Sequence, residues 1–133
     1  NKSLVIDGVV PTFRTSTGDT SPANGGTLTG VGGAFPNIVL DFSEAIQSIA
    51  GVVLTDNISI TTPTGGGDKV VDFTATIVSG NLVIDIDETD ADISSSVNQQ
   101  IYIDIDASTL SDVVGNSVVE VVGISSYSLL VTI

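Results

Sequence analysis

The stretch Ile101–Asp106, which reads IYIDID, places the strongest constraint on what this chain can fold into. Its isoleucines alternate one by one with Tyr102, Asp104 and Asp106. Successive side chains of a β-strand point to opposite faces, so this pattern predicts a strand with one buried face and one solvated face. A strand of that kind needs a second layer of structure to cover its apolar face.

Similar short runs recur along the chain, rich in Val, Ile and Thr and separated by Gly, Pro, Asn and Ser. We expect strands at residues 3–13, near 27–28, and at 37–46, 57–62, 70–78, 82–87, 101–106, 117–122 and 126–133. The Ser79-Gly80-Asn81 sequence predicts a tight hairpin between two of them. No stretch of a dozen residues carries the apolar stripe of a helix. The pattern therefore predicts an all-β sandwich or barrel of seven to nine antiparallel strands.

One face of each expected strand predicts the core. Its members are Ile38, Leu40, Phe42, Ile58, Ile60, Phe73, Ile84, Ile86, Ile101, Ile103, Ile105 and Leu110. Leu82 shares a face with Ile84 and Ile86, so Asp85 and Asp87 are expected on the opposite, solvated face of that strand.

Length and charge narrow the possible functions. The 133 residues fit one domain, residues 1–133, within the common range of about 100–150 residues. The chain has 16 acidic and 3 basic residues, so it lacks the clustered Lys and Arg that binding to nucleic acid or an anionic membrane requires. No unbroken apolar run reaches the roughly 18 residues of a membrane span. Because the chain starts without Met and ends in the strand-like run SLLVTI, we expect it to be one domain of a larger multidomain protein.

The segment Thr15–Ala34 consists mostly of Gly, Ser, Thr, Asn and Pro. A loop this long is uncommon in a compact domain and is usually functional or mobile. One interpretation is a tethered surface loop with a short strand near Thr27 and Leu28. The alternative is a loop that binds a polysaccharide or a protein.

Four segments, in order, resemble the landmarks of one known family. They are the turn Ser21–Gly25 (SPANG), the strand Ile38–Ile46 with its F-S-E ending (IVLDFSEAI), the strand Tyr102–Ile105, and the L-x-D-x-x-G-N turn Leu110–Asn116 (LSDVVGN). On these residues, the chain from about residue 20 to 132 resembles the bacterial Ig-like domains of S-layer proteins, the SbsA type. The Gly- and Thr-rich insertion at residues 27–34 and the acidic middle of the chain depart from the family's pattern.

This resemblance implies an Ig-like β-sandwich without catalytic activity. Members of the family are repeated modules of bacterial surface or secreted proteins, which act as structural spacers or adhesion units. By this resemblance we expect an extracellular or cell-surface location. The expected partners are neighbouring domains of the same polypeptide and a cell-surface protein or polysaccharide.

The residues of the last turn also have a local interpretation. Thr109 and Asp112 have the spacing of a reciprocal helix cap, a hydroxyl followed by a carboxylate three residues later. Gly115 then occupies the position where a one-turn helix ends with positive φ, and Asn116 tolerates such a backbone too. Asp112 is therefore expected to cap the turn rather than to catalyse a reaction.

Carboxylates form the only constellation in the sequence that could hold a metal ion or carry out catalysis. The candidate metal ligands are Asp85, Asp87, Asp90, Asp92, Asp104 and Asp106. Crowded carboxylates favour a cation, and Ca²⁺ fits best because it takes six to eight oxygen ligands, whereas zinc is disfavoured without His or Cys. No EF-hand pattern is met, and a solvated acidic face explains the same residues.

Catalysis is not expected. The chain has no His or Cys, which excludes the usual Ser-His-Asp and Cys-His nucleophile systems. A glycosidase would need two carboxylates at a set separation in a cleft lined for sugar, and the chain has no Trp to line one. Two hypotheses remain: a passive spacer in a tandem array, and a ligand-binding adhesion unit.

Overall fold

The computed structural model describes residues 8–30, 34–62, 69–90, 93, 100–123 and 127–132. Within this part the chain forms eleven strands and the one-turn helix α1, Leu54–Asn57. The strands are β1 Phe13–Arg14, β2 Thr27–Thr29, β3 Ile38–Phe42, β4 Gln47–Ser48, β5 Ile58–Thr62, β6 Lys69–Val70, β7 Phe73–Val78, β8 Asn81–Ile86, β9 Gln100–Ile105, β10 Leu110–Ser111 and β11 Ser128–Thr132. The expected β class is confirmed, since strands make up 45% of the structure and helix only 6%.

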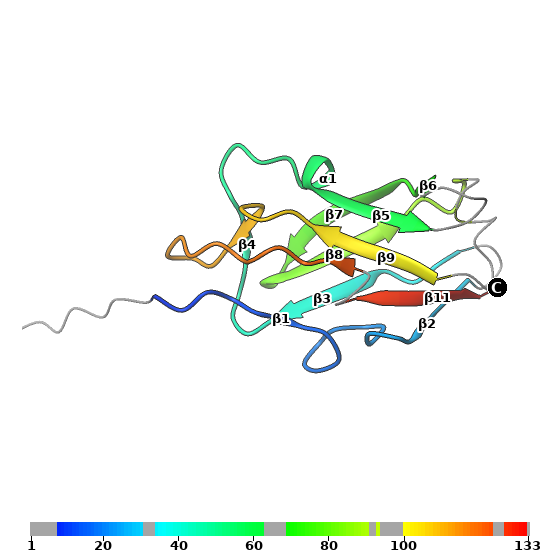
Figure 1. Cartoon of the computed structure of the whole chain (residues 1–133), viewed down its shortest axis with the longest axis horizontal. Coiled ribbons are helices and arrows are strands. Elements are labelled where there is room, and N and C mark those ends of the chain that lie inside the picture. Colours follow the sequence, from blue (N-terminus) through cyan, green and yellow to red (C-terminus); the bar gives the residue numbers. More distant parts are fainter. Residues whose placement is uncertain are drawn as a thin grey trace, which may run out of the picture.

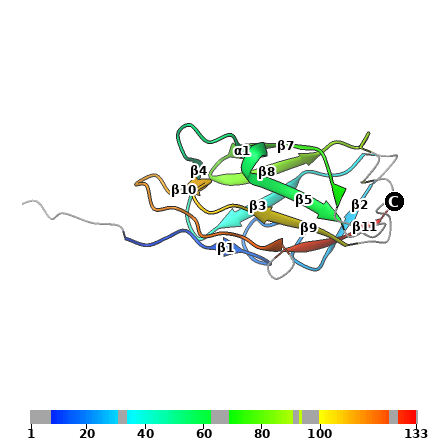
Figure 2. The ribbon, with the colours of Figure 1, turned by 45° about the horizontal axis from the view of Figure 1, so that its top comes forward.

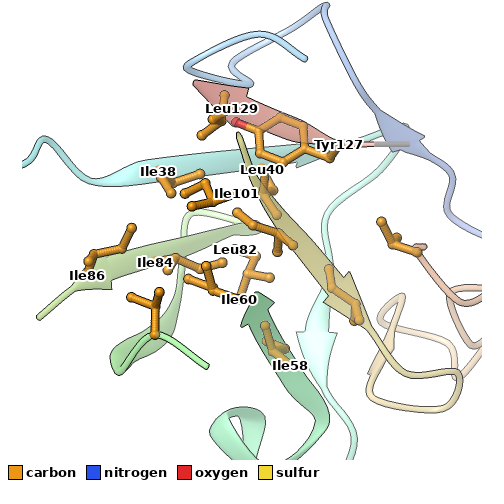
Figure 3. Packing of buried hydrophobic residues seen from close by; sticks show 14 of the residues in the cluster. Ile38, Leu40, Ile58, Ile60, Leu82, Ile84, Ile86, Ile101, Tyr127 and Leu129 are labelled. Carbon is orange, nitrogen blue, oxygen red and sulfur yellow. The ribbon is translucent and has the colours of Figure 1, made fainter. Parts of the chain in front are cut away.

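The strands form two main sheets on either side of one core (Figure 1, Figure 2). One sheet has the order β1-β3-β8-β7 and the other β2-β11-β9-β5-β6, while β4 and β10 make a small separate pair. Side chains from both sheets meet between the layers, as Ile84 of β8 and Ile60 of β5 do in Figure 3. The apolar faces predicted by the alternation therefore hold the two layers together.

The predicted core is confirmed in all but one position. Eleven of the twelve residues are buried, and Phe42 is only 1% exposed. Phe73, on the edge strand β7, is partly buried and packs against this cluster. The core also contains residues that the prediction omitted: Leu28, Ile46, Val71, Leu82, Ile93, Val118, Val121, Tyr127, Leu129 and Val131.

The hairpin between β7 and β8 forms as predicted. Its two turn residues, Ser79 and Gly80, both have positive φ, at 51° and 80°. This is the left-handed geometry of the tight two-residue turns that match strand twist. At Gly80 a Cβ would also lie 2.7 Å from the Cβ of Ala45, so glycine is required for space as well as for conformation.

The start of the chain is divided between the two sheets. β1 pairs antiparallel with β3, where Phe13 lies opposite Phe42. The chain then crosses to the other sheet, where β2 pairs parallel with β11 and Leu28 lies opposite Val131. The expectation of antiparallel strands alone is therefore wrong for this pair. Parallel pairing is possible here because about 100 residues of chain separate the two strands.

Three aromatic side chains pack together where the chain crosses between the two sheets. The Phe13 ring lies 5.6 Å from that of Phe42 and 5.5 Å from that of Tyr127, the second pair edge to face. The Tyr127 hydroxyl donates a hydrogen bond to the carbonyl oxygen of Pro22, in the crossing segment. Burial raises the pKa of Tyr127, so the hydroxyl remains a donor. This tyrosine therefore joins the start of the last strand to the first part of the chain.

Three predicted strands differ from the structure. The stretch at 70–78 is split into β6 and β7, because Val71 still donates its N–H to Ile60 of one sheet before the chain crosses to the other. The stretch at 117–122 makes only single bridges, at Ser117 and Val121. The first strand begins at Phe13, and residues 3–7 of the expected strand lie outside the described residues.

Candidate functional site

The structure separates the two acidic pairs that the sequence placed in one candidate calcium site. Asp85 belongs to β8 and Asp87 directly follows it, whereas Asp104 belongs to β9 and Asp106 follows that strand. β8 and β9 are in different sheets, and the side chains next to these aspartates along each strand point into the core. The two acidic pairs therefore lie on the outer faces of opposite layers and do not combine into one site.

Asp104 holds a neighbouring segment in place. Its Oδ1 accepts the N–H of Gly123 at 2.8 Å, which brings the chain ahead of β11 onto β9. A Cβ at Gly123 would lie 2.6 Å from the backbone nitrogen of Ile103, so only glycine approaches β9 this closely. Asp104 is thus a structural hydrogen-bond acceptor.

The acidic residues after β8 close a loop. Asp87 Oδ1 accepts the N–H of Thr89 at 2.8 Å and its hydroxyl at 2.6 Å, and these two bonds hold the pKa of Asp87 below its ordinary value. Asp90 Oδ2 accepts the N–H of Asp72 at 2.6 Å. Asp92, the remaining predicted ligand, lies outside the described residues.

These residues border a shallow hollow of about 290 Å³ on the outer face of β7 and β8. It is lined by Asp72, Phe73, Thr74, Asp85, Ile86, Asp87 and Glu88. Glu88 accepts the N–H of Phe35 at 3.3 Å. Among the described residues, no three acidic side chains are grouped so that they could hold a metal ion. The described residues of the hollow thus present an acidic surface.

The segment Thr15–Ala34, as far as it is described, is tied to the body of the protein. Gly25 donates its N–H to Ser128 and Gly26 accepts that of Leu130, both at 2.9 Å, while the Asn24 side chain accepts the N–H of Ser128 at 3.0 Å. The predicted short strand near Thr27 is confirmed as β2. These contacts agree with the tethered loop.

The other half of this segment is held by β3. Asp41 accepts the N–H of Asp19 at 3.1 Å and forms an ion pair with Arg14 at 3.2 Å. Thr20, in turn, accepts the N–H of Asp41 through its hydroxyl at 2.9 Å. These bonds fix the backbone of this half of the segment against β1 and β3, although most of its residues between 16 and 25 remain exposed.

The Leu110–Asn116 turn is a hairpin turn, so the prediction of a capped helical turn is wrong. Ser111, the last residue of β10, forms an antiparallel bridge with Ser117. Inside this bridge, the N–H of Asp112 donates to the carbonyl oxygen of Asn116 at 3.0 Å. The hydroxyl of Thr109 donates to the carbonyl oxygen of Asp106 instead of capping Asp112. Pairing with β4 makes this stretch extended, and it overrides the local preference for a helix.

Asp112 nevertheless organises the turn. Its carboxylate accepts the N–H groups of Val114 and Asn116, both at 2.9 Å, and the side-chain amide of Asn116 at 2.8 Å. Desolvation alone would raise the pKa of Asp112, but these hydrogen bonds outweigh it and hold the pKa below its ordinary value. The predicted positive φ of Gly115 is confirmed at 101°. The structural role expected for this aspartate therefore agrees with its contacts.

Comparison with known proteins identifies no relative: no protein-family model, no curated protein and no solved structure matches the chain. None of the described helices is long and apolar enough to cross a membrane. The geometry of the molecule itself must therefore support any functional proposal.

Proposed function

We propose that this chain is a non-catalytic Ig-like module that serves as a structural spacer in a bacterial surface or secreted protein. The observation that carries the proposal is the order of its strands. An Ig domain has the order A-B-E-D in one sheet and G-F-C in the other, with C′ added next to C in variable-type domains. Taken along the chain, β3, β5, β6, β7, β8, β9 and β11 correspond to B, C, C′, D, E, F and G. β1 and β2 then form the two halves of strand A, one in each sheet.

The positions of the two chain ends support the spacer role. In Figure 1 the described chain starts at one end of the long axis, ahead of β1, and β11 runs to the other end. Figure 2 shows the same arrangement. A domain with this geometry extends a polypeptide by its full length when it is joined to neighbouring domains.

The pairing of β2 with β11 suits a domain that carries tension. Three backbone hydrogen bonds of 2.9 Å join these segments, from Gly25 to Ser128, from Leu130 to Gly26 and from Gly30 to Thr132. The strands are parallel, so pulling the two chain ends apart slides one strand along the other. The bonds are then loaded together rather than one after another. We call residues 24–30 with 128–132 the terminal clasp.

Single-molecule force spectroscopy tests the proposal. The chain is pulled from its two ends, and the unfolding force is compared between the native protein and Asn24→Ala, which removes the acceptor for the Ser128 N–H. Asn57→Ala is the matched control, because Asn57 also makes one side-chain bond to backbone, to Val53 at 2.9 Å, but outside the clasp. Asn24→Ala is expected to lower the unfolding force and Asn57→Ala to leave it unchanged. Equal forces in all three proteins would argue against a spacer that carries tension.

The alternative, a ligand-binding unit that uses the Thr15–Ala34 loop, has less support. The described part of this loop is fastened to β3 and β11, as the bonds from Asp19 to Asp41 and from Gly25 to Ser128 illustrate. We therefore place the spacer first. A bacterial surface location follows from the resemblance of the turns and strands and belongs to the same proposal.

A further inference from the structure

β7 is the longest sheet edge in the described structure and the least protected one. The outer strands of the two main sheets are otherwise short: β1 and β6 have two residues each and β2 has three. β7 has six residues, FTATIV, with no proline, glycine or charged side chain. Natural proteins usually shorten, charge or interrupt an exposed edge, because its unpaired backbone groups accept another strand. β7 has none of these protections in its own sequence.

The backbone groups available at this edge follow from the ladder with β8. The N–H of Asp87 donates to the carbonyl oxygen of Asp72 at 2.9 Å, which places these two residues at a hydrogen-bonded position of the ladder. Such pairs alternate along an antiparallel ladder. The N–H and C=O groups of Phe73, Ala75 and Ile77 therefore point away from β8. No strand of the described part of the chain pairs with β7 on that side.

The helix α1 limits the open part of the edge to one half. α1 packs against both β5 and β7. It precedes β5 directly and lies toward the end of β7 that leads into the Ser79–Gly80 turn (Figure 1, Figure 2). No described strand pairs with the half at Phe73 and Ala75, which therefore offers two N–H and two C=O groups.

The acidic hollow adjoins this open half. Thr74 lies opposite Asp85 in the ladder, and Asp72 lies two residues before Thr74, so both carboxylates flank it on the outer face. Both aspartates are exposed, and neither carboxylate accepts a hydrogen bond from a described residue. A strand added to β7 would direct every second side chain to this face, within reach of the two carboxylates.

We propose that the open half of β7 binds an extended, basic segment of a partner protein by strand addition, with a Lys or Arg side chain in the hollow between Asp72 and Asp85. The backbone groups of Phe73 and Ala75 supply the hydrogen bonds, and the two carboxylates select a positive side chain. A second copy of this chain is the less suitable occupant. Each copy carries a net charge of −13, and its β7 has no basic residue to place in the hollow. This docking function is separate from the spacer role.

A synthetic peptide tests the proposal on the whole chain. The probe is an acetylated and amidated hexapeptide, Thr-Val-Lys-Val-Thr-Val, in which Thr and Lys share one face. It is titrated into ¹⁵N-labelled protein and followed by NMR. The largest shifts are expected at the amides of Phe73 and Ala75. A peptide with Glu in place of Lys should bind more weakly, and one N-methylated along the pairing edge should not bind. No binding of the Lys peptide, or shifts confined to other strands, would overturn the proposal.

Variants separate the backbone contribution from the charge contribution. Ala75→Pro removes an outward N–H without breaking the ladder to β8, and it should abolish binding. Asp72→Asn combined with Asp85→Asn should weaken binding about tenfold at low salt, since exposed ion pairs each contribute modestly. Asp106→Asn combined with Glu120→Gln removes the same charge elsewhere and should leave the affinity unchanged. Equal weakening by both double variants would overturn the specific role of the hollow. A concentration-dependent dimer that Ala75→Pro abolishes would replace the basic peptide with a second copy.

Discussion

Replacing Phe42 with alanine tests how the two layers are held together. Phe42 is 1% exposed, and its ring lies 5.6 Å from that of Phe13, so the substitution empties space in the middle of the core. Truncating a buried phenylalanine costs about 3–5 kcal/mol. At about 0.05–0.15 kcal/mol per residue, the 133 residues have a total stability of about 7–20 kcal/mol. The variant should therefore lose a large share of its free energy of unfolding. It should still fold if the native value lies in the upper part of that range.

The expected change in melting temperature follows from the size of the domain. An unfolding entropy of about 2.1 cal/mol/K per residue gives about 0.28 kcal/mol/K for 133 residues, so a loss of 4 kcal/mol lowers Tm by about 14 °C. Urea titration and calorimetry measure both quantities. Phe73→Ala is the matched control, since Phe73 is only partly buried at the edge strand β7 and should lose about half as much. A loss below about 1.5 kcal/mol for Phe42→Ala, or one no larger than for Phe73→Ala, would refute the reasoning.

Three further predictions concern particular side chains. Gly123→Ala places a Cβ 2.6 Å from the backbone nitrogen of Ile103 and should cost about 1–3 kcal/mol in a urea titration, whereas Gly8→Ala, with open space around it, should cost nothing; equal results would contradict the close approach. The pKa of Asp112 is lowered in the folded state, so its stabilising effect is present above the unfolded value near 3.8 and is lost as the pH falls through the folded pKa. Melting curves from pH 7 to pH 2 should therefore depend less on pH in Asp112→Asn than in the native protein, and unchanged dependence would refute this role. Melting in EDTA, CaCl₂ and MgCl₂ should give one temperature, because the described carboxylates are divided between two sheets. A Ca²⁺-specific rise of about 8–10 °C, as expected for a site at about 100 times its Kd, would contradict that division.

Alternation along single strands predicted most of the core because it depends only on neighbouring residues. Ile101, Ile103 and Ile105 are buried, as the alternation requires. Asp104 is on the outer face of the same strand, and Asp106, which follows it, is exposed. The Ser79–Gly80 turn was predictable for the same reason, since its geometry depends on the turn residues themselves. Both the burial pattern of a strand and the geometry of a tight turn are set by adjacent residues, so both can be predicted from the sequence.

Features that depend on distant pairing were not predictable in the same way. The segment at Leu110 has residues suited to a helix cap, but its pairing with β4 makes it a strand. Which sheet a strand joins is also decided by distant contacts, so the sequence placed Asp85 and Asp104 together although β8 and β9 are in opposite sheets. The parallel pair of β2 and β11 joins residues about 100 positions apart and has no local signal.

The open edge of β7 has a recognisable signal in the sequence. The run FTATIV is free of charge, proline and glycine, and such a run at a sheet edge favours strand addition. The role of Asp72 has no such signal, because this residue stands apart from the acidic cluster in the sequence. Only the ladder of β7 with β8 brings it close to Asp85.

The division of the first part of the chain between the two sheets is the central claim, since the Ig-like proposal depends on it. Cross-strand nuclear Overhauser effects of β1 and β2 in isotope-labelled protein test it most directly. We predict contacts between Leu28 and Val131 in a parallel register, together with antiparallel contacts between Phe13 and Phe42. An antiparallel pairing of β2 with β3, the next strand along the chain, would contradict this division between the sheets and remove the basis of the proposed function. The absence of contacts between β2 and β11 would do the same.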